Sequence, residues 1–338
     1  MKPFSDIEEQ LRILQEDKKL LIQDMDNAIF ALMNCGYYEI VNGYKIFLLD
    51  PNEEDEVFKK GETFEHLASL YNLDKELRNY VMQATLEIEN SLKTALAYTI
   101  AEDFGVYEID YLNRTNYVKG KWQKHHQNYQ RDHLLDMLKD IAANRKVEPL
   151  ISYRVKHGHI PPWILFKEAT FGNFVNLFKV LKGPQKNKVI AHCIGLDINL
   201  LTEDDKRLFG EMLDLVLAFR NRAAHGGRIF NYKAKRNTAL SYHSKFHPQI
   251  DISPADYRHG KGRNDFYTFF YSMVIFDNKN GHNYLNFCLY KIIEHEKEYP
   301  SDLEILERQM GFPQGRLYNE IEKLNQTINL YRLLNDKN

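Results

Sequence analysis

Apolar residues recur three or four positions apart along most of this chain, and few helix-breaking residues interrupt them. The 338 residues include only 17 glycines and 10 prolines, about 8% of the chain against an average of about 12%. Hydrophobic residues make up 43% of the chain, enough for a sizeable core. The sequence therefore predicts an all-α protein.

Composition and charge exclude several classes of protein. No stretch approaches the roughly 18 to 20 apolar residues that a membrane span requires, so we expect no membrane partner. The first ten residues turn acidic before any apolar run, unlike a secretory signal, which favours a cytoplasmic protein. The three cysteines, Cys35, Cys193 and Cys288, are widely separated, so neither a disulfide framework nor a thiolate metal cage is indicated.

Caps and apolar spacing predict the principal helices. We expect one helix from about Asp6 to Asn34, with Ser5 and Glu8 as a capping box, and a long helical run from Thr63 to Gly105, broken or kinked near 72–74. Further predictions are a short helix ending before Pro149, two short helices within 163–181, a helix opened by Thr202 and Asp205 and stopped by Gly226 and Gly227, a buried aromatic segment at 266–276, a capping box of Ser301 with Glu304, and a last helix at 317–334.

Positive charge gathers in one window of the sequence. Residues 220–263 hold ten basic and two acidic side chains, interleaved with aromatic residues such as Phe230, Tyr232 and Tyr242. Such a segment is typical of proteins that bind a phosphate backbone and stack on bases. The alternative is a solvated loop whose charge balances residues 1–60, which hold seven basic and 13 acidic side chains.

A cation, an amide and a titratable base occur together at 220–225, where Arg220 and Asn221 precede His225 by one helical turn or slightly more. RNA cleavage without a metal needs groups that transfer protons and a fixed positive charge for the phosphorane-like transition state. Histidine suits the proton transfers, and the planar fork of arginine suits the phosphoryl oxygens. The alternative is a basic helix C-terminus that complements the helix dipole.

Three Arg–His pairs have four to six residues between them, so the spacing alone is not specific. The pair Arg154 and His159 lacks a polar residue directly after the arginine, and Arg236 and His243 lie in a turn-rich region. Only Arg220 with His225 also lies at the end of an amphipathic helix. The motif at 220–225 is therefore the candidate catalytic site.

The phrase Phe219 to His225 resembles the Arg-Asn-x-x-x-His signature of HEPN ribonucleases, and several further segments resemble the Abi family of bacterial abortive-infection proteins, of the AbiD and AbiF type. In chain order these segments are Ser5–Leu11 with Leu21–Asp24, Gly36–Tyr38 with Asn42–Tyr44, Leu70–Tyr71 with Asp74–Arg78, Ile88–Glu89 with Leu92–Lys93, Pro161–Trp163 with Glu168–Ala169 and Phe171–Gly172, and Arg220–His225. The resemblance ends near Tyr232.

The resemblance implies a HEPN-type helical bundle, here with extra N- and C-terminal helices and a basic loop insertion, that cuts RNA without metal in anti-phage defence. We expect an Abi-like domain at 1–232, the insertion at 233–265 and a C-terminal helical extension at 266–338. The expected catalytic residues are Arg220, Asn221 and His225, and the expected RNA-binding residues are Arg222, Arg228, Tyr232, Lys233, Lys235 and Arg236. The competing function is a non-catalytic protein that holds a structured noncoding RNA, and a third is a toxin silenced by an antitoxin.

Helix geometry predicts a homodimer. On a continuous helix, Arg220 and His225 lie about 140° apart around the axis, while Asn221 and His225 are about 40° apart. Either the last turn unwinds at the glycines or two copies of the motif face each other across a dimer.

No cofactor or metal site is expected from the remaining polar residues. His243 and His247 have a zinc-like spacing but turn-like surroundings and no third ligand, and the pairs at 125–126 and 157–159 are interpreted as surface or RNA-facing. Glu89 is interpreted as an exposed ion-pair partner of Lys93; the alternative is that Glu87 and Glu89 lie on a helix that packs near the motif.

Overall fold

The computed structural model describes residues 4–317, 319 and 320, and it confirms the all-α prediction. The α-helices are α1 Ile7–Arg12, α2 Met25–Cys35, α3 Phe64–Phe104, α4 Glu108–Tyr111, α5 Gln130–Asn144, α6 Leu150–His157, α7 Pro162–Leu165, α8 Phe171–Val180, α9 Gly183–Ile194, α10 Glu203–Ala224, α11 Pro254–Arg258, α12 Phe266–Val274, α13 Lys279–Glu298 and α14 Asp302–Met310. The strands β1 Trp122–Gln123 and β2 Asn128–Tyr129 pair antiparallel, with Trp122 opposite Tyr129. Among the described residues, no helix has the length and apolar character needed to cross a membrane.

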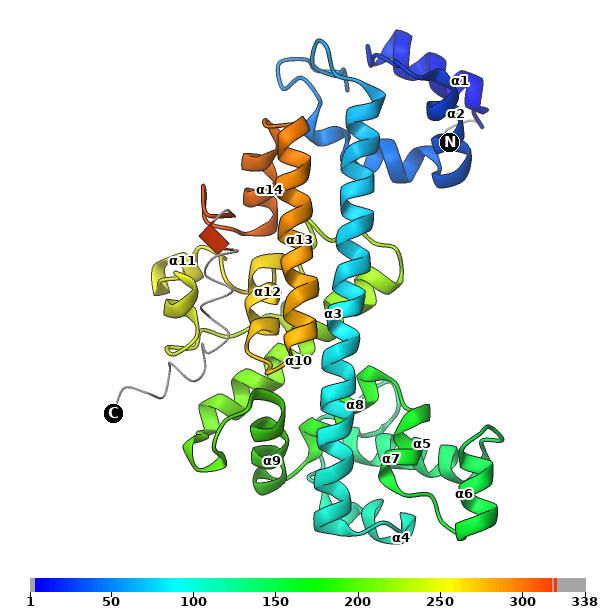
Figure 1. Cartoon of the computed structure of the whole chain (residues 1–338), viewed down its shortest axis with the longest axis vertical. Helices are drawn as coiled ribbons and strands as arrows, with labels where there is room; N and C mark the ends of the chain where they lie inside the picture. The colour runs from blue at the N-terminus through cyan, green and yellow to red at the C-terminus, as the bar shows by residue number, and fades with distance from the viewer. Residues whose placement is uncertain (1–3, 318, 321–338) are drawn as a thin grey trace.

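Helix α3 is the spine of the molecule and runs along most of its length (Figure 1). Its 41 residues correspond to about 60 Å at 1.5 Å per residue. The Thr63 hydroxyl accepts a hydrogen bond from the backbone N–H of His66 and caps its N-terminus. An apolar stripe recurs along one face every three or four residues and packs against α13, α9 and α10. The predicted break near 72–74 is wrong, since the helix continues through this point.

The N-terminal segment is not the single helix that the sequence predicts. Helix α1 is capped by Asp6 rather than Ser5, continues as a π-helical turn to Asp17, and then stops. Residues 18–24 instead leave the helical path, and Leu21 exchanges backbone hydrogen bonds with Glu62 and Phe64. Those bonds fix the chain against the start of α3 and separate α1 from α2.

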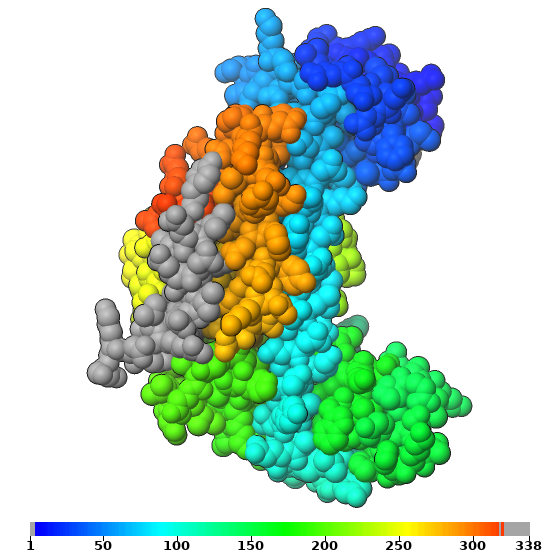
Figure 2. Space-filling view, viewed as in Figure 1, coloured from blue at the N-terminus to red at the C-terminus, as the bar shows by residue number. Residues whose placement is uncertain are grey.

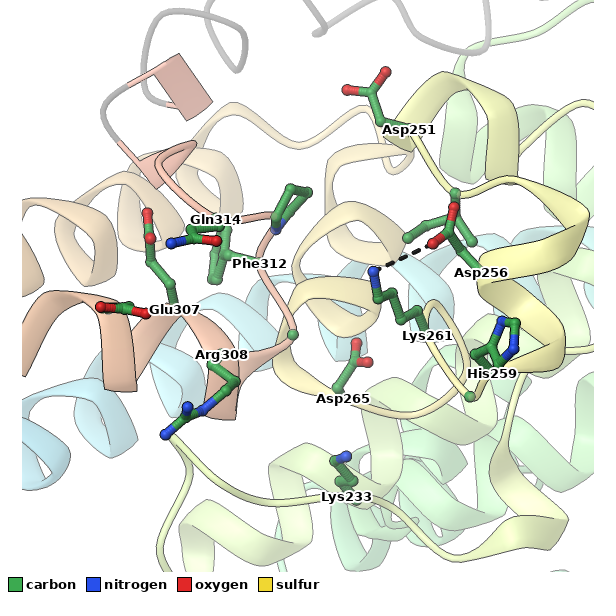
Figure 3. A pocket seen from close by; sticks show the side chains of 15 residues that line it. Lys233, Asp251, Asp256, His259, Lys261, Asp265, Glu307, Arg308, Phe312 and Gln314 are labelled. Carbon is green, nitrogen blue, oxygen red and sulfur yellow. Dashed lines mark hydrogen bonds and ion pairs between the residues drawn. The ribbon is translucent and has the colours of Figure 1, made fainter. Parts of the chain in front are cut away.

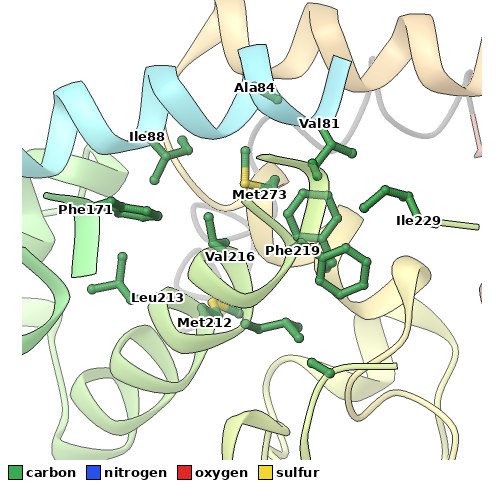
Figure 4. Packing of buried hydrophobic residues seen from close by; sticks show 14 of the residues in the cluster. Val81, Ala84, Ile88, Phe171, Met212, Leu213, Val216, Phe219, Ile229 and Met273 are labelled. Carbon is green, nitrogen blue, oxygen red and sulfur yellow. The ribbon is translucent and has the colours of Figure 1, made fainter. Parts of the chain in front are cut away.

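Helix α10 begins and ends where its sequence predicts. Thr202 and Asp205 form a reciprocal capping box, and its buried residues face α3, α8 and α12 (Figure 4). Phe219 is fully buried and stacks on Phe269 of α12, with ring centroids 4.5 Å apart. The aromatic segment at 266–276 is buried throughout, as predicted.

Other predictions have mixed outcomes. The short helix before Pro149 is α5, and the two short helices within 163–181 are α7 and α8. The predicted capping box at Ser301 is wrong, since its side chain makes no capping hydrogen bond to α14. The last predicted helix, at 317–334, lies almost wholly outside the described residues.

The surface is hollowed beside α3, between the N-terminal segment and the region of α4 to α8 (Figure 2). The yellow-green chain that leaves α10 lies on this side of α3. The end of α10 therefore opens toward a concave face of the molecule.

A buried carboxylate joins α3 to the chain that follows α10. Asp74 is only 1% exposed, and its Oδ1 accepts the backbone N–H groups of Ile229 and Phe230 at 2.9 and 3.0 Å. Its Oδ2 accepts the Tyr44 hydroxyl at 3.0 Å and Arg78 Nη1 at 2.7 Å. Burial raises the pKa of Asp74, and the Arg78 charge and the backbone donors oppose this effect. Asp74 thus fixes the path of residues 229–230.

Replacing Asp74 with Ala is expected to lower the free energy of unfolding by about 3 to 5 kcal/mol, because Arg78 and two backbone N–H groups lose a buried partner. Urea denaturation measures the loss. The exposed Asp55→Ala is the control and is expected to change stability by less than about 0.5 kcal/mol. Equal stability of the two variants would contradict this role for Asp74.

Candidate functional site

The motif predicted to be catalytic lies on the last turn and at the cap of α10. The helix extends to Ala224, and the backbone N–H of His225 still bonds to the carbonyl of Asn221 at 3.1 Å. Gly226 then adopts a φ of 71°, which ends the helix. Since the last turn keeps its helical form, Arg220 and His225 project from different sides of α10.

Arg220 faces a carboxylate on α3. Its Nη2 lies 3.8 Å from Glu89 Oε2, and the two side chains are 29% and 16% exposed. Within the described part of the chain, Arg220 Nε and Glu89 Oε2 are buried and have no hydrogen-bond partner. The other contact of the guanidinium is a long one, 3.5 Å from Nη1 to Asn221 Oδ1. The charge of Glu89 therefore orients Arg220, and the Arg220 side chain stays partly exposed, where an anion can reach it.

Glu89 is not the exposed partner of Lys93 that the sequence indicates. Lys93 instead donates to Asn90 Oδ1 at 3.0 Å, and Glu89 turns toward Arg220. Burial raises the pKa of Glu89, whereas the charges of Arg220 and Lys93 lower it. The sequence alone favoured the exposed pair, and the structure instead supports the alternative for Glu89, which packs beside the motif.

Asn221 and His225 are exposed at the surface. Their helical spacing of four residues places them on neighbouring sides of the last turn. An exposed imidazole and an exposed amide at a helix end can contact a large ligand such as a nucleic acid.

Three residues predicted to bind RNA make contacts within the protein. Arg222 Nε donates to the carbonyl of Arg228 at 3.1 Å, and its guanidinium lies 5.3 Å from the ring centre of Tyr232. A Cβ at Gly227 would collide with the Arg222 side chain, so glycine is required for this close approach. Arg228 Nη1 in turn donates to the carbonyl of Gly43. These contacts shape the chain after α10 and leave both guanidiniums partly accessible.

Lys233, Lys235 and Arg236 are exposed, but they differ in their surroundings. Lys233 lines a cavity of about 390 Å³ beside Asp265 and Arg308 (Figure 3). Burial raises the pKa of Asp265, and the charge of Lys233 lowers it. Lys233 thus faces a carboxylate, whereas Lys235 and Arg236 are open to a polyanion.

Two histidines of the basic segment, His243 and His247, lie in the protein interior. His243 and His247 are 1% and 0% exposed, and His247 Nε2 lies 2.8 Å from the carbonyl of Gly262. Burial lowers the pKa of both imidazoles. His247 begins a short 3₁₀-helix, so the regular α-helix that a zinc pair with this spacing needs is not formed.

Comparison with known families identifies the group to which this chain is related. The profile of the Abi-like protein family matches residues 31–231. The chain belongs to this family. No curated protein and no solved structure matches it. Membership suggests a role in abortive infection and defence.

The matched range of this Abi-like protein contains α3 and α10 with Asp74, Glu89 and the motif at 220–225. It ends before the exposed Lys235 and Arg236 and before helices α11 to α14. Those later residues must be interpreted from their own contacts.

The pairing of Arg220 with Glu89 predicts a specific titration. Carbon-13 NMR of labelled glutamates is expected to place the pKa of Glu89 above its ordinary value of 4.5, because burial disfavours its charge. Arg220→Ala is expected to raise that pKa further, since the neighbouring positive charge is removed. The distant Arg154→Ala is the control. A Glu89 pKa that does not respond to Arg220→Ala contradicts the pairing.

Proposed function

We propose that this Abi-like protein is a metal-independent endoribonuclease of the HEPN type, acting in a bacterial abortive-infection system. The observation that carries the proposal is the arrangement of Arg220, whose partly exposed side chain lies 3.8 Å from Glu89, beside exposed Asn221 and His225 at one helix end. This combination offers a fixed cation, an amide and a titratable base. The family relationship and the concave face beside α3 support the same function.

In the proposed reaction the 2'-OH of a ribose attacks the adjacent phosphorus, and the bond to the 5'-oxygen breaks. His225 takes the proton from the 2'-OH or protonates the leaving 5'-oxygen. Arg220 binds the phosphoryl oxygens, whose charge grows in the transition state, and Asn221 orients the phosphate. Glu89 positions Arg220 through their ion pair. No metal or cofactor takes part in these steps.

The RNA is proposed to lie across the chain that follows α10. Lys235 and Arg236 supply exposed charge for phosphates, and Lys233 adds charge at the rim of its cavity. Tyr232, Arg222 and Arg228 form the edge between this segment and the catalytic residues. The arrangement gives electrostatic attraction without base-specific recognition.

The active form is proposed to be a homodimer with a composite site. Because α10 remains helical to Ala224, Arg220 and His225 of one chain point in directions about 140° apart. A second protomer that faces the motif would bring its own His225 close to the first protomer's Arg220. Each site would then use residues from both chains.

The alternative function is a non-catalytic protein that holds a structured noncoding RNA. The exposed charge of Lys235 and Arg236 is the observation that favours it, since binding needs no base. The two functions differ in their dependence on His225.

Purified protein is expected to cleave labelled single-stranded RNA in EDTA. His225→Ala is expected to lower the rate by about 10² to 10⁴-fold, the usual range for one general acid or base, while RNA binding is retained. Lys235→Ala with Arg236→Ala is expected to weaken binding instead. Gel-based cleavage and filter binding measure the two effects.

The exposed His192 on α9 provides the control, since His192→Ala removes an imidazole far along the chain from the motif. Cleavage that persists in His225→Ala would contradict the mechanism, and so would cleavage that EDTA abolishes while the protein stays folded by circular dichroism. Tight binding without any cleavage would instead support the alternative function.

A mixing experiment tests the composite site. Excess protein with both Arg220→Ala and His225→Ala is expected to depress the activity of the unaltered protein below simple dilution, because mixed dimers form. Sedimentation is expected to show a dimer at micromolar concentration. A monomer with full nuclease activity, or activity that only dilutes, would show that each chain carries a complete site.

A further inference from the structure

Three helix ends meet at a cluster of two imidazoles and one carboxylate. His66 lies in the first turn of α3, His295 in the last turn of α13, and Asp302 is the first residue of α14. Their exposed fractions are 6%, 7% and 3%. The Nε2 atoms of His66 and His295 lie 2.8 and 2.7 Å from the same Asp302 oxygen, Oδ2.

The outer nitrogens of both imidazoles are also engaged. His66 Nδ1 lies 2.8 Å from Glu62 Oε2, and His295 Nδ1 lies 3.2 Å from Ser69 Oγ. The ring of Tyr299 stacks on that of His66, with centroids 3.9 Å apart and planes 3° from parallel. Metal-binding histidines nearly always bond their second nitrogen to a carboxylate or another acceptor, which fixes the ring. Both rings are thus oriented with Nε2 turned inward.

Without a bound cation, this cluster of side chains carries an uncompensated negative charge. If both Nε2 atoms donate to Asp302, the His66 Nδ1 that faces Glu62 must also carry a proton. His66 is then an imidazolium held between two carboxylates, while His295 is neutral and accepts from Ser69. One positive charge is shared by two largely buried negative groups, which leaves a net charge of −1 in a region of low dielectric.

We propose that His66, His295 and Asp302 bind a divalent first-row metal ion of the Zn²⁺ class. The metal takes the position of the two Nε2 protons. His66 loses one proton to solvent and keeps Nδ1–H for Glu62, and the proton of His295 moves from Nε2 to Nδ1, where Ser69 Oγ accepts it. Binding therefore releases one proton and brings the charge of the cluster to zero.

The geometry fits a small adjustment of these side chains. Zinc binds nitrogen and oxygen at about 2.0 to 2.2 Å, so neighbouring ligand atoms of a tetrahedral site lie about 3.3 Å apart. Here the ligand atoms already lie within 4.8 Å of one another. Asp302 needs to withdraw by about 0.5 Å, and the two Nε2 atoms need to come to about 3.3 Å from each other. Three protein ligands leave a fourth position for water.

The proposed role is a clamp between α3 and the C-terminal helices. His66 and Asp302 are 236 residues apart in the sequence, so the metal would join the start of α3 to the start of α14. Glu89, the partner of Arg220, lies about 35 Å further along α3, at 1.5 Å per residue. His295 and Asp302 lie outside the range that matches the Abi-like family. The metal thus takes no part in the proposed cleavage.

Zinc and cobalt titrations of the full chain test this site. After dialysis against a chelator, calorimetry with ZnCl₂ is expected to show one tight equivalent and the release of one proton, and the melting temperature is expected to rise. CoCl₂ is expected to give visible d–d absorption of a tetrahedral site. His295→Gln and Asp302→Asn are expected to abolish these signals, and Glu62→Gln to weaken zinc binding by about 10 to 100-fold.

Two control variants distinguish zinc binding at this site from zinc binding by other histidines and from RNA cleavage. His126 and His133 stack at the surface with centroids 3.7 Å apart and are a place for adventitious zinc, so His126→Gln with His133→Gln is expected to keep the tight equivalent. His225→Ala is expected to keep it as well, although RNA cleavage is lost. Failure of either proposal is therefore visible without the other.

Two results would overturn the metal site. These are the absence of a stoichiometric equivalent, and binding that is lost with His126→Gln and His133→Gln but kept in Asp302→Asn. If the Asp302→Asn protein fails to fold by circular dichroism, X-ray absorption of the zinc-loaded protein with His126→Gln and His133→Gln decides. Two imidazole ligands support the proposal, and fewer than two contradict it.

Discussion

Burial of one face of α3 along its whole length is the constraint on which the rest of the structure depends. The stripe packs against α13, α9 and α10. A single rigid helix carries His66, Asp74 and Glu89. The positions of the His66–His295–Asp302 cluster, the buried carboxylate and the candidate site are therefore fixed relative to one another. A change in one packing partner of α3 would affect all three.

Two contacts connect this spine to the candidate site. Asp74 fixes the chain just after the motif through the N–H groups of Ile229 and Phe230, and Glu89 fixes Arg220 within it. The Asp74 contact is buried and hydrogen-bonded. The Arg220–Glu89 contact is long, at 3.8 Å, and Arg220 Nε has no hydrogen-bond partner among the described residues. Rigid support beneath a cation with spare donors is what binding a phosphate in its transition state requires.

Local signals in the sequence were sufficient for α10, whose capping box and terminal glycines act within one turn. They failed at 72–74, where Asn and Asp suggest a break, because Asp74 is satisfied by N–H groups 155 and 156 residues away. Glu89 was misplaced for a similar reason, since Arg220 comes from another helix. The cluster around His66 joins residues 236 positions apart, which no spacing rule detects.

The chemical nature of the RNA ends tests the central claim most directly. If Arg220, Asn221 and His225 promote attack by the 2'-OH, mass spectrometry of the products will show a 2',3'-cyclic phosphate on the upstream fragment and a 5'-OH on the downstream fragment. Products with a 3'-OH and a 5'-phosphate would mean that water attacks the phosphorus, and they would contradict the account of this site.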